Sequence, residues 1–146
     1  SRNYRPFQRK INEAINTLTL RGEPINGGKI VAELTFGFWT KLFNSAHERL
    51  LWRDLSRVFS NMPRSMRQRN TVSGHINKIR TFRNRIYHYE PISWNYTALM
   101  DNYELIIETL DWMNADIKEW AVEGCIFSKV HKTYKRKLKR IGVNPL

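Results

Sequence analysis

The chain is short, aromatic and strongly basic. Its 146 residues suit one domain with a hydrophobic core, and a hydrophobic fraction of 41% with 12% aromatics excludes a disordered chain. The 25 Lys and Arg residues outnumber the 13 Asp and Glu, and the net charge of +12 favours a polyanionic or acidic partner. A single cysteine, Cys125, excludes an internal disulfide.

Cellular location follows from what the sequence lacks. We find no signal peptide and no apolar run long enough to cross a bilayer, so the sequence predicts a cytoplasmic protein with no membrane partner. The single cysteine fits a reducing compartment. The absence of a methionine before Ser1 leaves open a longer natural N-terminus.

The first half of the chain predicts helices. Apolar residues recur at helical spacing over Arg5–Leu20, and Arg21–Gly28 has the glycines and proline of a loop. We expect one helix over Lys29–Phe43, with a strand as the alternative because of its β-branched and aromatic residues. We expect another helix over Ser45–Phe59, with its first residue as the N-cap and its core face formed by Leu51, Leu55 and Val58.

The second half continues the all-α pattern. The spacing predicts a helix from Thr71 to about Tyr89, ended by Pro91, with Val72, Ile76, Ile79, Phe82 and Ile86 facing the core. The longest helix is predicted over Trp94–Glu123, with a broad apolar stripe that reaches Trp120 and a stop at Gly124. We therefore predict a helical domain over residues 1–124, followed by a basic helix or tail over residues 125–146.

Charge is arranged in blocks along the chain. No Asp or Glu occurs between Leu55 and Tyr89, whereas the segment from Glu90 to Glu123 is acidic. The tail turns basic again over Ser128–Arg140. Such blocks predict a basic surface beside an acidic helix. The basic tail is either a solvated helix or an arm that binds phosphates, and the sequence does not separate these two readings.

The stretch RTFRNRIYHYEP, from Arg80 to Pro91, contains the candidate catalytic residues. His88 could accept the proton of a ribose hydroxyl that attacks the neighbouring phosphate, because an imidazole titrates near neutral pH. Arg83 could hold the phosphate oxygens in a bidentate contact, and Asn84 could orient the hydroxyl or the ring. The alternative reading is a packed or capping histidine beside solvated arginines.

Helical geometry limits how these three side chains could meet. Asn84 and His88 share a face because they lie four residues apart, but Arg83 and His88 diverge on an ideal helix. They would converge only if the helix loosened before Pro91 or if a second copy of the chain supplied its own set. The acid-free span offers no carboxylates for magnesium, and the histidines and Cys125 lack zinc-ligand spacing, so we predict no metal and no cofactor.

Two segments carry a resemblance to a known family. KIVAELTFGFWTKLF, from Lys29 to Phe43, and INKIRTFRNRIYHYEPI, from Ile76 to Ile92, resemble the Abi-like abortive-infection proteins of the HEPN superfamily. The signature of that superfamily is an arginine, a polar residue and a histidine after four to six intervening positions, which Arg83, Asn84 and His88 match. One departure is Tyr89, where the Abi-like pattern often has a second histidine.

This resemblance implies a function. It implies a HEPN-type helical bundle that forms a homodimer, with a metal-independent endoribonuclease site at the dimer seam built from Arg83, Asn84 and His88. RNA is then the expected partner, guided by Lys78, Arg80 and Arg85. The resemblance also implies a role in phage defence or as a toxin restrained by an antitoxin-like partner. The alternative is a non-catalytic module that binds nucleic acid or another protein.

Overall fold

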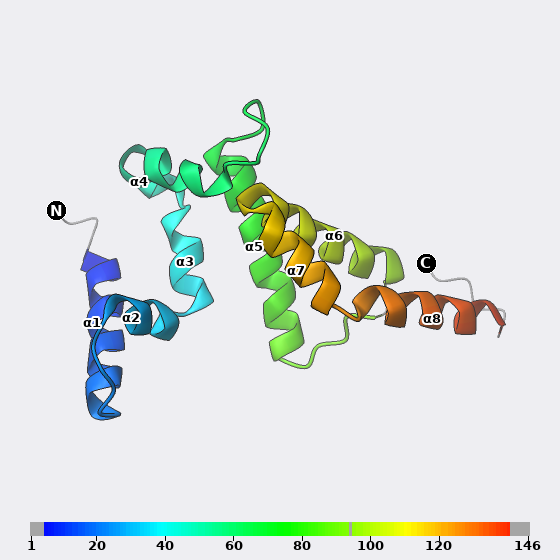
Figure 1. Cartoon of the computed structure of the whole chain (residues 1–146), viewed down its shortest axis with the longest axis horizontal. Coiled ribbons are helices and arrows are strands. Elements are labelled where there is room, and N and C mark those ends of the chain that lie inside the picture. The colour runs from blue at the N-terminus through cyan, green and yellow to red at the C-terminus, as the bar shows by residue number, and fades with distance from the viewer. Residues whose placement is uncertain (1–4, 94, 141–146) are drawn as a thin grey trace. The chain divides into compact units, whose positions relative to one another are not determined.

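The regular structure of the described residues is entirely helical, as the sequence predicted. The computed structural model describes residues 5–93 and 95–140 (Figure 1). The α-helices are α1 (Arg5–Leu20), α2 (Gly27–Glu33), α3 (Phe36–Leu42), α4 (Glu48–Leu55), α5 (Arg69–Tyr87), α6 (Tyr96–Met113), α7 (Ala115–Gly124) and α8 (Phe127–Arg140). Two short 3-10 helices, η2 (Ser45–His47) and η3 (Ser56–Phe59), flank α4. Trp94, the predicted start of a helix, lies outside the described residues, as do residues 141–146 of the predicted tail.

The chain divides into two compact units, Ser1–Arg53 and Asp54–Leu146. A domain boundary after residue 124 stays a prediction. Within the described residues, no helix combines the length and the apolar character that crossing a membrane would require.

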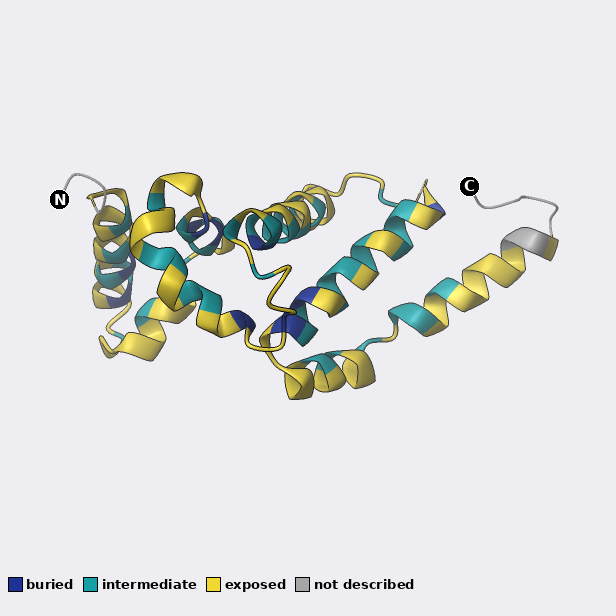
Figure 2. Cartoon of the chain, turned by 90° about the horizontal axis from the view of Figure 1, so that it is seen from above, coloured by how far each residue is buried: buried dark blue, intermediate teal, exposed yellow. Residues whose placement is uncertain are grey.

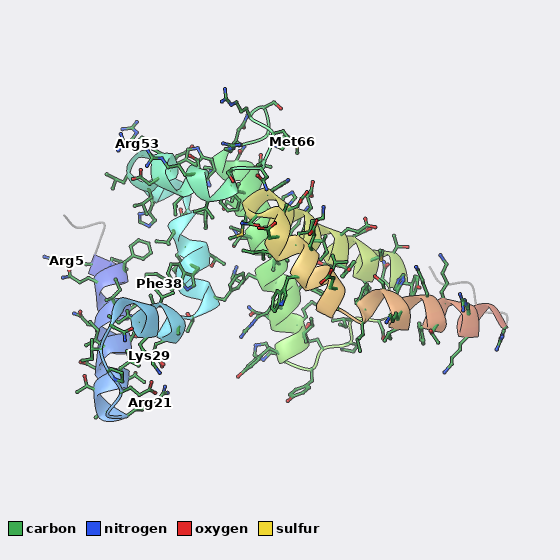
Figure 3. All side chains as sticks on the ribbon, in the orientation of Figure 1. Arg5, Arg21, Lys29, Phe38, Arg53 and Met66 are labelled. Atoms are coloured by element: carbon green, nitrogen blue, oxygen red, sulfur yellow. The ribbon has the colours of Figure 1, made fainter. Side chains whose placement is uncertain are left out.

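The N-terminal unit has a small aromatic core. Helix α1 buries Ala14 and Leu18, which are 5% and 2% exposed. Phe7 at the start of α1 meets Phe38 of α3 edge to face, with ring centroids 5.6 Å apart. Phe38, labelled in Figure 3, is 8% exposed. Edge-to-face packing of this kind adds to the free energy gained from burial.

The predicted helix over Lys29–Phe43 is wrong in one respect, because it is interrupted. Helix α2 ends at Leu34, whose ψ is 129°, and Thr35 adopts extended angles (φ −68°, ψ 156°) as the N-cap of α3. The apolar stripe alone would have allowed one continuous helix. A β-branched threonine favours extended backbone, and the contact of Phe38 with Phe7 adds a tertiary constraint that the local pattern does not contain.

The predicted helix over Ser45–Phe59 is also interrupted. Its N-cap is Asn44, whose side-chain oxygen accepts a hydrogen bond from the amide of Ala46 at 3.1 Å, and not Ser45. Only Glu48–Leu55 is α-helical, with a 3-10 turn on each side. The expected inward residue Val58 is 44% exposed, whereas Phe59 beside it is 1% exposed. The tighter turn of the 3-10 segment shifts the buried face by one residue.

Helices α5, α6 and α7 form the framework of the C-terminal unit, with α6 packed against both of the others (Figure 1). Its core includes Phe59, Met62, Val72 and Trp112, each no more than 5% exposed. The segment before α5 is fixed by Arg67, whose guanidinium donates to the carbonyl oxygens of Met62 and Ser60 at 2.6 Å.

The longest predicted helix, Trp94–Glu123, is in fact two. Asn114 has extended angles (φ −167°, ψ 129°) and serves both as the C-cap of α6 and as the N-cap of α7. Its side-chain oxygen accepts hydrogen bonds from the amides of Asp116 at 2.7 Å and Ile117 at 3.3 Å. Asparagine is among the strongest N-cap residues, so this side chain ends one helix and starts the next. After this corner Trp120, expected on the apolar stripe, is 77% exposed.

Candidate functional site at the end of helix α5

A Schellman turn ends α5 and determines where His88 lies. His88 is the C-cap of the helix, and its amide still donates to the carbonyl of Asn84 at 2.9 Å. The amide of Tyr89 then donates to Ile86 at 3.0 Å and that of Glu90 to Arg85 at 2.9 Å. This pair of reversed hydrogen bonds defines the motif. The helix therefore ends before Pro91 has any influence, which corrects the predicted cause of its termination.

The turn contains an unusual backbone conformation. Tyr89 has φ 57°, the only positive φ among the described residues other than glycine. This left-handed conformation normally belongs to glycine at the corresponding position of a helix end. The Tyr89 side chain is 96% exposed, so no buried contact compensates for the conformation.

Arg85 clasps the same turn from the helix side. Its Nε lies 3.2 Å from Oε2 of Glu90, and its Nη2 donates to the carbonyl oxygen of Pro91 at 2.9 Å. The guanidinium thus contacts residues on the far side of the turn, five and six positions along the chain. Arg85 was predicted to bind RNA, and in this structure its contacts hold the turn.

The candidate catalytic residues lie along one exposed helix end. Nη1 of Arg83 is 3.3 Å from Oδ1 of Asn84. The Arg83 guanidinium also lies over the ring of Tyr87, with Cζ 4.8 Å from the ring centroid. The Tyr87 ring in turn meets the His88 ring edge to face, with centroids 5.7 Å apart. Tyr87 therefore connects the arginine and the histidine that diverge on an ideal helix.

The sequence argument missed the bridging role of Tyr87. A tyrosine four residues after an arginine on a helix is a possible cation–π pair, so the spacing of Arg83 and Tyr87 was the available signal. The ring is 66% exposed and leaves His88 open to solvent. The arrangement offers an imidazole, an amide and a guanidinium to one incoming group, although no single copy of the chain closes around it.

An apolar hollow adjoins these side chains. It has a volume of about 400 Å³ and is lined by Ile79, Phe82, Arg83, Ile86, Tyr87 and Ile106. Ile86, expected to face the core, is 47% exposed here. The site therefore combines a polar end with an uncovered apolar flank.

The predicted RNA-binding residues do not all lie together. Lys78 and Arg85 line a hollow of about 370 Å³ with Asn77, Thr81 and Asn102, on the side of α5 that meets α6. Arg80 lies half-buried, with its Nε donating to Oδ1 of Asn77 at 3.4 Å. The structure thus brings Lys78 and Arg85 to one groove and engages Arg80 locally.

A second histidine of α5 is packed into the unit. Nδ1 of His75 is 3.8 Å from Oε2 of Glu108, and its ring lies 4.3 Å from that of Trp112. Burial lowers the pKa of the His75 imidazole below its ordinary value, Glu108 partly raises it, and Lys78 lowers it further. His75 was expected to be a surface residue that might line the catalytic groove, and its packing contradicts that expectation.

Among the residues that the structure describes, no group of three His, Cys, Asp or Glu side chains is arranged to hold a metal ion. No protein-family model matches the chain, and neither a curated protein nor a solved structure matches it.

Proposed function

We propose that the chain is an endoribonuclease of the HEPN type that cleaves RNA without a metal ion, with its site at the end of α5. The supporting observation is the row formed by Arg83, Tyr87 and His88, in which a guanidinium 4.8 Å from one ring is linked to an imidazole through that ring. Guanidinium and imidazole side by side are the groups that phosphodiester transesterification requires.

Each side chain has one role in the proposed reaction. His88 accepts the proton of the ribose 2′-hydroxyl as its oxygen forms a bond to phosphorus. Arg83 binds the two phosphate oxygens that gain charge, and Asn84, 3.3 Å from the guanidinium, holds the hydroxyl in line. The bond from phosphorus to the 5′ oxygen then breaks, and that oxygen takes a proton from a protonated imidazole. The products are a cyclic phosphate and a 5′-hydroxyl.

A second copy of the chain completes the proposed site. One copy supplies one imidazole, whereas the reaction needs a proton acceptor and a proton donor at the same time. The apolar hollow beside Arg83 and the half-exposed Ile86 give a surface that a second copy would cover. A homodimer would therefore bring two sets of Arg83, Asn84 and His88 together. Phage defence in the cytoplasm, under an antitoxin-like restraint, is the biological role that we propose for this activity.

The test uses purified protein, labelled RNA and EDTA. We expect the wild-type chain to cut RNA in EDTA, to leave a cyclic phosphate, and to spare an RNA whose cleaved position lacks the 2′-hydroxyl. His88→Ala and Arg83→Ala should abolish cleavage, while Arg83→Lys should retain a part because lysine keeps the charge but loses the bidentate contact. His47→Ala is the matched control, since His47 lies in the other unit.

Two outcomes would refute the proposal. One is a His88→Ala protein that cuts RNA at the wild-type rate. The other is a wild-type protein that shifts RNA on a gel without cutting it, which would favour the alternative of a non-catalytic nucleic-acid-binding module. An intact helical signal by circular dichroism and an unchanged dimer in both variants would show that the loss is chemical.

A further inference from the structure

Helix α8 carries the densest positive charge of the described chain. It contains no acidic residue and seven cationic ones, namely Lys129, Lys132, Lys135, Arg136, Lys137, Lys139 and Arg140. Within the described part of the chain, none of the ion pairs found involves a cation of α8. Unneutralised like charges repel one another, so this helix gains free energy when a polyanion neutralises it.

The opposite face of α8 is anchored to α6 by stacked rings. The ring of His131 stacks on that of Tyr96 with centroids 3.8 Å apart, and Phe127 stacks on Tyr103 at 4.6 Å. The Tyr96 hydroxyl also donates to the carbonyl oxygen of His131 at 2.7 Å. The aromatic face is therefore occupied, and most of the remaining surface of α8 is exposed (Figure 2). Nitrogen-tipped side chains project from it (Figure 3).

An aromatic ring lies within this cationic surface. A hollow of about 310 Å³ is lined by Lys129, Val130, Thr133, Tyr134 and Lys137. Tyr134 is 46% exposed. The two lysines lie eight residues apart, which is about 12 Å along a helix axis at 1.5 Å per residue. A base stacked on Tyr134 would thus have a lysine within reach of the phosphates on either side.

We infer that the exposed face of α8, with Tyr134 between Lys129 and Lys137, is a binding site for single-stranded nucleic acid. Proteins that hold single strands combine a positive track for the backbone with aromatic rings on which bases stack. A duplex keeps its base faces stacked internally, so Tyr134 could not reach them. This site lies on a different helix from His88 and does not depend on cleavage there.

An anionic membrane is the other polyanion that a basic helix could meet. A helix lying in a membrane interface needs a broad apolar face to insert among the lipids. The aromatic face of α8 is stacked against Tyr96 and Tyr103. The exposed surface that remains keeps Val130 and Tyr134 among the lysines. The charge pattern with one partly exposed ring fits a nucleic-acid strand better than a lipid surface.

The test measures binding to strands that the proposed nuclease cannot cut. Fluorescein-labelled oligothymidylate and 2′-O-methyl oligouridylate lack a free 2′-hydroxyl, and they separate DNA from RNA as the source of the strand. Anisotropy titrations between about 50 and 200 mM salt give the affinity and its salt slope. We expect K129Q/K137Q to reduce that slope by about 1.4, since each phosphate contact on a single strand contributes about 0.7.

Further variants separate the ring from the charge. Tyr134→Leu should lower the affinity about fivefold or more without changing the salt slope, because stacking is not an ionic contact. The matched control is K29Q/K118Q, which removes two lysines that are already paired with Glu23 at 2.6 Å and Asp111 at 3.2 Å. This control should bind with a salt slope close to the wild-type value.

Three results would overturn the inference. These are a K129Q/K137Q protein that binds like the control, a duplex that binds as tightly as the single strands with no effect of Tyr134→Leu, and binding only to phosphatidylserine vesicles. A wild-type protein that binds these strands but leaves RNA uncut would refute the nuclease proposal and support this one. A protein that cuts RNA equally well in the K129Q/K137Q form and binds no uncut strand would do the reverse.

Discussion

Replacing Tyr89 with glycine should stabilise the protein, even though it removes a large side chain. Left-handed backbone costs a residue with a β-carbon about 1–2 kcal/mol, and Tyr89 adopts it with φ 57°. Glycine avoids that cost but loses about 0.5–1 kcal/mol more conformational entropy on folding. The 96% exposed ring contributes no burial that could be lost. We therefore expect a net gain of about 0.5–1 kcal/mol in the free energy of unfolding.

Thermal and urea unfolding followed by circular dichroism would measure this gain. For a chain of this size, 1 kcal/mol corresponds to about 2–4 °C in Tm, so the glycine variant should unfold about 1–4 °C higher. Tyr89→Ala is the control, because it removes the ring yet keeps the β-carbon and therefore the strain. A glycine variant no more stable than the alanine variant would show that the positive φ stores no free energy, and the reasoning would fail.

Three further substitutions test contacts of the C-terminal unit. His75→Gln should flatten the pH dependence of stability: the lowered pKa makes the wild-type His75 bind fewer protons than the unfolded chain, so stability present above about pH 6.5 is lost as the pH falls towards the folded-state pKa. Arg85→Ala should cost about 1 kcal/mol by opening the clasp on Glu90, a half-exposed ion pair of modest value, and on Pro91. Tyr96→Phe should also cost about 1 kcal/mol, because the carbonyl of His131 loses a donor.

Each of these has its own check, read from urea unfolding. Glu108→Gln removes a group that raises the pKa of His75, so the loss of stability on acidification should become steeper, and an unchanged profile would contradict the assignment. Glu90→Gln separates the ionic part of the Arg85 clasp from its backbone hydrogen bond. Tyr103→Phe serves beside Tyr96→Phe, because Tyr103 contributes a ring stack but no recorded hydroxyl hydrogen bond. Equal losses in the two tyrosine variants would argue against a role for the Tyr96 hydroxyl.

Local patterns predicted the helices where one apolar stripe meets a clear stop. Helix α1 occupies its predicted range, Arg5–Leu20, because a single stripe runs into Gly22, whose φ is 65°. The breaks at Thr35 and Asn114 were missed because the apolar spacing continues across both. At Asn114 the signal was present in the sequence as a strong N-cap residue with Asp116 in the following turn, and the long stripe outweighed it.

The candidate site was predictable in its members but not in its geometry. Arg83, Asn84 and His88 follow from residue chemistry and spacing, whereas the helix end that positions His88 depends on hydrogen bonds of the Schellman turn. No propensity favours tyrosine in left-handed backbone, so the conformation of Tyr89 could not be read from the chain. The clasp by Arg85 joins residues five and six apart, a spacing that helical periodicity does not contain.

The junction at Asn114 has a consequence for how chain length can change in evolution. With one residue between α6 and α7, an inserted amino acid would turn everything downstream by about 100° around the helix axis. Such a rotation would carry α8 and its stacked rings off Tyr96 and Tyr103. Insertions and deletions should therefore accumulate elsewhere, as in residues 60–68 between η3 and α5, while the number of residues from α6 to α8 stays constant.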